Sequence, residues 1–162
     1  KRQVSEKRIE GERTKNAAAI FEAIDKQDLQ RATAVLEANP DLANAVSKDL
    51  STPLIECAIR NWLPFADMLL KNGAEPNLAD TEDFTALHEA ARRGHPEMVR
   101  LLIRAGANPN LGASLGRFPP LLMALSTPMT NNQAAVSEVV DALLELGADI
   151  QTTTLALSLI HI

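Results

Sequence analysis

The residues best able to do chemistry in this chain are two histidines and a glutamate, because such side chains bind metals and transfer protons. His88 and Glu89 are adjacent, and His95 follows His88 by seven residues. The helical motif of zinc proteases places its two histidines four residues apart, so that both face one metal ion. A spacing of seven does not fit that motif, and we predict no metal site here.

Two other patterns were weighed as reactive sites. The glycine-rich segment 112–116 lacks the Gly-Lys-Ser/Thr ending of phosphate-binding loops, and Ser114 lacks the Gly-x-Ser-x-Gly setting of a hydrolase nucleophile. We expect a turn there. The acidic residues are scattered without a paired acid–base arrangement, at Asp67, Glu75, Asp80 and Asp83. The sequence therefore predicts no enzyme activity, no catalytic residue and no cofactor.

Composition narrows the possible partners. The 16 basic and 21 acidic residues give a net charge of −5, which opposes binding to a phosphate backbone. Aromatic residues make up 3% of the chain and tyrosine is absent, so platforms for stacking bases are scarce. No apolar run approaches the ~20 residues of a membrane helix. We predict neither nucleic-acid binding nor membrane insertion. A single cysteine, Cys57, rules out an internal disulfide and leaves the compartment open.

The elements that position these residues repeat along the chain. T-P-L at Thr52 and T-A-L-H at Thr85 are 33 residues apart, as are Gly73 and Gly106, which end the blocks that follow. A 33-residue period with this T-P-L-H-type motif resembles the ankyrin-repeat family. The resemblance covers about residues 16–151. It implies an all-α solenoid of stacked helix–turn–helix units with projecting finger turns, and a role in binding another protein.

The repeat pattern divides the chain into four units, near 16–44, 45–77, 78–110 and 111–151. Asp28 is expected to cap the second helix of the first unit. Asn39 stands where Gly73 stands later, and we expect it in the left-handed conformation that ends many helices. In the second unit we predict helices over 53–60 and 64–72.

The fourth repeat departs from the pattern. Leu121 and Gly147 are 26 residues apart, whereas Leu87 and Gly106 are 19 apart. The seven extra residues fall in the polar stretch 126–132, before a helix predicted over 133–146. A longer loop is often functional, and drift in a solvent-facing turn explains it equally well.

The two ends of the chain carry separate expectations. Residues 1–15 are charged, which favours a solvated helix or linker over a basic arm. Residues 152–162 are expected to be a truncated end. Its last six residues, 157–162, resemble the translation of a sequencing adapter, so we expect the native protein to continue beyond this segment; a genuine apolar tail is the alternative.

The resemblance also assigns structural roles. It implies that His88 bonds within its own turn and that His95 begins a second helix. Cys57 falls at a position for a small packing residue. Asp83 stands at a finger position usually held by glycine, and Leu50, in the same place one repeat earlier, is expected to bend its finger differently. The expected core leucines are Leu54, Leu69, Leu87, Leu101, Leu102, Leu121 and Leu143.

Ankyrin proteins bind partners through the finger tips and the concave face of their first helices. Carried over to this chain, the partner-binding positions are Lys48, Asp49, Ser51, Arg60, Thr81, Glu82, Phe84, Arg92, Arg93, Leu115, Arg117 and Ser126. Phe84 and the two adjacent arginines are residue types that dominate interface energies. The resemblance therefore predicts a non-catalytic, monomeric protein-binding module. The alternative is a regulatory or targeting segment of a larger enzyme or transporter.

Overall fold

A computed structural model of the protein describes residues 17–48, 50–112, 118–126 and 130–151. The segments predicted as a charged linker (1–15) and as a truncated end with a non-native tail (152–162) lie outside this part of the chain. Among the described residues, no helix is long and apolar enough to span a membrane.

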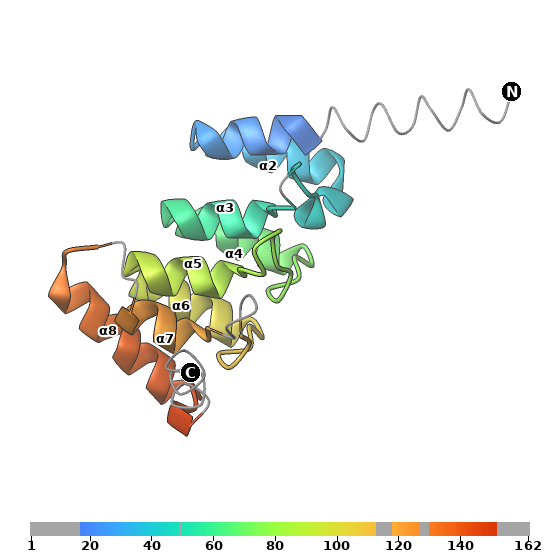
Figure 1. Ribbon diagram of the computed structural model, residues 1–162. Helices are drawn as coiled ribbons and strands as arrows, with labels where there is room; N and C mark the ends of the chain where they lie inside the picture. Colours follow the sequence, from blue (N-terminus) through green and yellow to red (C-terminus); the bar gives the residue numbers. More distant parts are fainter. Residues whose placement is uncertain (1–16, 49, 113–117, 127–129, 152–162) are drawn as a thin grey trace, which may run out of the picture.

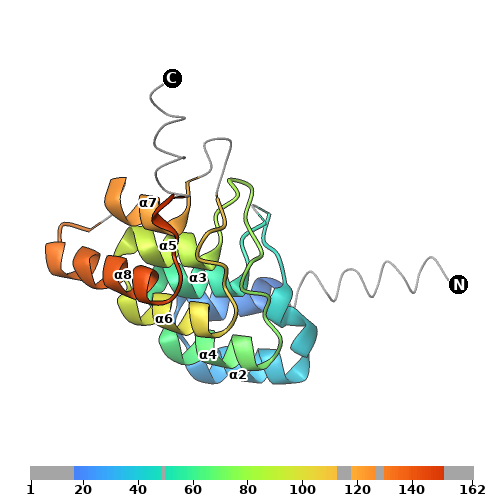
Figure 2. The ribbon, with the colours of Figure 1, turned by 90° about the horizontal axis from the view of Figure 1, so that it is seen from below.

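Helix pairs are stacked side by side along the chain, as Figure 1 shows. Residues 17–25 are helical, and the helices that follow are α2 (Leu29–Ala38), the short 3-10 helix η1 (Pro40–Asn44), α3 (Pro53–Arg60), α4 (Leu63–Lys71), α5 (Ala86–Arg93), α6 (Pro96–Arg104), α7 (Pro120–Ser126) and α8 (Gln133–Glu145). The first helices form one layer, in which α3 packs on α5 and α5 on α7. The second helices form another, in which α4 contacts α6 and α6 contacts α8 (Figure 2). This confirms the predicted all-α solenoid.

The caps of the first helices explain where they begin and end. The Thr52 hydroxyl accepts from the Ile55 N–H at 3.2 Å, and Pro53 fills the first turn, where no N–H is needed. α3 ends at Asn61 and α5 at Gly94, both in left-handed geometry with φ of 53° and 71°. The predicted helix over 53–60 is confirmed, and the one predicted over 64–72 begins and ends one residue earlier.

The first repeat ends differently from the prediction. Asp28 does cap α2, accepting from the Arg31 N–H at 3.0 Å. Asn39, however, has φ of −149°, so the expected left-handed conformation was wrong. The chain turns directly into η1 at Pro40, whose ring favours an extended residue before it.

Both described finger turns close with the same hydrogen bond. The Ser47 N–H donates to the Ser51 carbonyl at 2.9 Å, and one period later the Asp80 N–H donates to the Phe84 carbonyl at 3.0 Å. The fingers are therefore built alike.

Leu50 and Asp83 occupy equivalent places in these fingers and share left-handed backbone, with φ of 56° and 63°. The prediction that the finger of Leu50 bends differently was wrong. The closing hydrogen bond holds the leucine in a conformation that costs an ordinary residue about 1–2 kcal/mol.

The core runs continuously through the stack. Six of the seven predicted core leucines are buried, whereas Leu101 is half-buried and packs against the core. Cys57 is fully buried there, and burial raises the pKa of its thiol. A thiol that stays protonated is a poor nucleophile, which agrees with its predicted packing role.

The long connection of repeat four follows α7. Ser126 is the last residue of α7, so the connection covers residues 127–132, of which the structure describes Thr130 to Asn132. Asn132 caps α8 by accepting from the Ala135 N–H at 3.3 Å. The helix predicted over 133–146 is observed over 133–145.

Candidate functional site

The candidate surface combines the finger turns with the exposed side of α3, α5 and α7. In Figure 2 the fingers extend on the side of this first-helix layer, away from α4 and α6. Lys48, Thr81 and Glu82 are exposed on the fingers. The structure thus places these predicted residues together with those at the ends of α3 and α5.

In the third repeat, two arginines share one buried carboxylate. The Glu89 side chain is 4% exposed and accepts from Arg92 Nη2 at 2.5 Å and from Arg93 Nε at 2.9 Å. The guanidinium carbon of Arg92 lies 5.3 Å from the centre of the Phe84 ring, within range of a cation–π contact. Phe84 is half-buried, so the sequence overestimated its exposure. These four residues form the Arg92–Arg93 cluster.

In the second repeat, one arginine meets two carboxylates. Arg60 contacts Glu56, four residues earlier, and Asp25 in the first repeat. The Ser51 hydroxyl donates to Glu56 Oε1 at 2.8 Å, and Ser51 is 8% exposed. The expected exposure of Ser51 is therefore wrong, because its hydroxyl supports Glu56 from within the fold.

The remaining predicted residues are placed incompletely. Asp49, Leu115 and Arg117 lie outside the described residues, and Ser126 is described only as the end of α7.

His88 joins the third repeat to the fourth. Its Nδ1 accepts from the Thr85 N–H at 3.2 Å, and its Nε2 lies 3.1 Å from the Phe118 carbonyl, which can only accept. The ring is therefore neutral with its proton on Nε2. Burial lowers the pKa of His88 to about 4, against the opposing effect of the Phe118 carbonyl. The structural role that the family resemblance assigned to this histidine is confirmed.

His95 joins the third repeat to the second. Its Nδ1 lies 2.9 Å from the Ala58 carbonyl, and the residue directly precedes α6. Burial lowers the pKa of His95 as well. Within the described part of the chain, no group of three or more histidine, cysteine or acidic side chains could hold a metal ion.

Sequence reasoning missed a ladder of asparagines between repeats. Asn44, Asn77 and Asn110 recur every 33 residues, and each Nδ2 donates to the carbonyl of a glycine in the next repeat, at 2.8–3.1 Å. Each Oδ1 accepts a backbone N–H two residues beyond that glycine, at 2.7–2.8 Å. Their shared period was the signal that could have revealed them.

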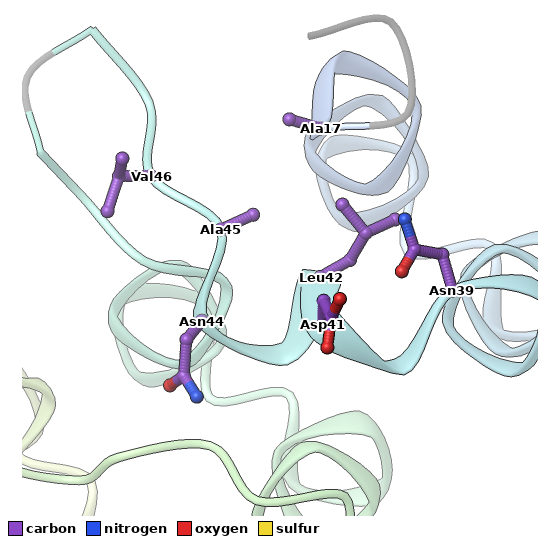
Figure 3. A pocket seen from close by; sticks show the side chains of 7 residues that line it. All are labelled: Ala17, Asn39, Asp41, Leu42, Asn44, Ala45 and Val46. Atoms are coloured by element: carbon purple, nitrogen blue, oxygen red, sulfur yellow. The ribbon is translucent and has the colours of Figure 1, made fainter. Parts of the chain in front are cut away.

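A pocket of about 550 Å³ lies at the N-terminal end of the stack (Figure 3). Leu42, Ala45 and Val46 give it apolar walls, while the Asn44 carboxamide is engaged by the next repeat. The pocket is well away from the Arg92–Arg93 cluster and brings together no reactive groups.

Comparison with known proteins identifies the repeat. A family model described as "Ankyrin repeats (3 copies)" matches residues 17–113. The chain is 30% identical over 129 residues to "Glycerophosphocholine phosphodiesterase gde1" of Schizosaccharomyces pombe, covering 79% of this chain and 11% of that protein. It is 32% identical over 113 residues to "Ankyrin repeat and SAM domain-containing protein 6" of Rattus norvegicus, covering 68% of this chain and 13% of that protein.

A third relative is human "Inversin", 38% identical over 84 residues, which covers 52% of this chain and 8% of that protein. The chain thus spans between 8% and 13% of the length of these three relatives.

Proposed function

Because the chain belongs to the ankyrin-repeat family, whose repeats generally mediate protein–protein interaction, we propose that it binds a protein partner through its finger tips and the concave face of its first helices. It acts as a monomeric, non-catalytic module of four repeats, over 16–44, 45–77, 78–110 and 111–151. The proposed contact residues are those carried over from the family. Ser51 contributes through Glu56.

One observation carries this proposal. Phe84, Arg92 and Arg93 lie next to the exposed finger residues Thr81 and Glu82, on a face that the stacking of the helices leaves open. Aromatic and arginine side chains held in place by neighbours are typical anchors of interfaces, because little side-chain entropy remains to be lost on binding.

Site-specific photo-crosslinking tests the surface. A photoreactive residue at Thr81 should crosslink a partner from cell extract, and the same residue at Arg104, exposed on α6 in the other helix layer, should not. Crosslinking of the same partner from Arg104 but not from Thr81 would contradict this choice of face.

Replacing Phe84 with alanine should weaken capture of that partner while leaving the fold intact. Reversing the charges of Arg92 and Arg93 is a poor test, because it would surround the buried Glu89 carboxylate with negative charge. Unchanged capture by the Phe84→Ala variant, with unaltered melting, would remove Phe84 from the surface.

A second function is favoured by one relative. The similarity to a protein named as a phosphodiesterase, of which this chain matches 11%, supports a role as the regulatory or targeting segment of a larger enzyme. Sequencing the source DNA across both ends of this reading frame tests it. A catalytic or transporter domain in the same frame would favour this role, and further repeats alone would favour the dedicated binding module.

A further inference from the structure

We propose that the Arg92–Arg93 cluster is a docking point for a carboxylate side chain of the protein partner, so that the partner presents an acidic segment to the third repeat. This inference rests on the proposed function and adds the chemistry of the partner to it. Its basis is a local excess of positive charge that the fold builds and does not neutralise.

The charge count of the cluster is uneven. Two guanidinium groups contact the single carboxylate of Glu89, and no other acidic side chain pairs with either arginine in the described part of the chain. The cluster therefore carries one net positive charge. The chain as a whole carries −5, so attraction of an acidic ligand to this face must come from the cluster itself.

Arg60 provides the internal comparison, because it occupies the place of Arg93 one period earlier. It contacts two carboxylates, Asp25 and Glu56, so its surroundings carry one net negative charge. Both arginines lie in the last turn of their helix, where the helix dipole favours cations equally. The dipole therefore does not account for the difference, which lies in the number of carboxylates.

The two arginines are also held in place before any partner arrives. Their side chains are 22% and 30% exposed, each is tied to Glu89, and Arg92 lies over the Phe84 ring. The Nε of Arg92 is buried without a hydrogen-bond partner. Partly desolvated cations attract an incoming carboxylate more strongly than cations in open water, and fixed side chains lose less entropy on binding.

The probe is an acetylated and amidated hexaglutamate peptide, compared with hexaglutamine, and the readout is the set of arginine Nε–H signals in NMR spectra. We expect saturable shifts of the Arg92 and Arg93 signals with hexaglutamate, and little change at Arg60 or Arg104. Equal shifts with hexaglutamine, or no shift at the cluster, would overturn the proposal.

Single substitutions keep Glu89 paired with the remaining arginine, so the buried carboxylate is not left unpaired. Arg92→Ala and Arg93→Ala should each weaken hexaglutamate binding by about tenfold, which corresponds to ~1.4 kcal/mol. Arg104→Ala changes the net charge by the same amount from the other layer, and should change the affinity by less than about twofold. An equal loss in Arg104→Ala would show a general charge effect and overturn the proposal.

The two proposals fail in different ways. If a partner crosslinks through Thr81 but Arg92→Ala and Arg93→Ala leave its capture unchanged, the carboxylate site is wrong and the binding face stands. If hexaglutamate binds at the cluster while partners crosslink only from Arg104, the site stands and the proposed binding face is wrong.

Discussion

Gly94 and Thr130 approach each other so closely that a β-carbon on Gly94 would lie 2.8 Å from Cγ2 of the threonine. The long connection of the fourth repeat therefore packs on the turn between α5 and α6 of the third repeat. Of the two readings of this connection, function or drift, the contact adds a structural role to either.

Gly94→Ala should destabilise the protein for two reasons. Its φ of 71° is unfavourable for alanine, by about 1–2 kcal/mol, and the new methyl group would overpack against Thr130, by roughly 1–3 kcal/mol more. Urea unfolding measures the sum. Gly73→Ala is the control, since its φ is 86° and nothing lies within 4 Å of an added β-carbon.

A double variant separates the two causes. Thr130→Ser removes Cγ2 and keeps the hydroxyl that accepts from the Asn132 N–H. In its presence the cost of Gly94→Ala should fall to that of Gly73→Ala. A cost that stays unchanged would mean that the contact with Thr130 has no energetic weight.

Asn77→Ala should lower the free energy of unfolding by about 1–3 kcal/mol. The substitution removes the donor to the Gly106 carbonyl at 3.1 Å and the acceptor for the Asn108 N–H at 2.7 Å, two bonds that join the second repeat to the third. Chemical denaturation checks this against Asn131→Ala, at an exposed position of the repeat-four connection. Equal stability of the two variants would contradict a stabilising ladder.

Stability should decline as the pH falls from about 6.5 to about 4, in part through His88. Burial lowers its pKa to about 4 in the folded protein from an ordinary value of 6.5, so the unfolded chain binds a proton first over this range. The contribution is fully present above pH 6.5 and reaches a loss on the order of 3 kcal/mol at pH 4. The measurement is urea unfolding across this range. The His88→Gln variant should show a shallower slope, and identical slopes would contradict the assignment.

Leu50→Asn should stabilise the protein by about 0.5–1 kcal/mol, because asparagine tolerates left-handed backbone better than leucine and the Leu50 side chain is 48% exposed. Thermal unfolding measures the gain. Asp83→Asn, at the same place in the next finger, should change little, since aspartate already tolerates this conformation. A loss of stability in Leu50→Asn would show that the exposed leucine makes packing contacts that outweigh its strain.

The sequence alone determined the repeat and its helices. Helix starts follow from local chemistry, such as the threonine cap and proline first turn at Thr52 and Pro53, and the 33-residue period follows from identical residues returning in register. Turn residues such as Gly94 were predictable because glycine accepts left-handed backbone without steric cost. Asn39 was not, because the proline after it constrains its backbone.

Only the tertiary structure decided which side chains meet between repeats. Arg60 and Arg93 look alike in the sequence, yet Arg60 meets Asp25 from the preceding repeat, whereas Arg93 shares Glu89 with Arg92. The exposure of Phe84 and Ser51 and the contact of Thr130 with Gly94 were likewise outside the reach of local patterns. Charge balance, burial and close packing depend on distances across the stack, and those distances are fixed only when the apolar faces of neighbouring repeats pack together.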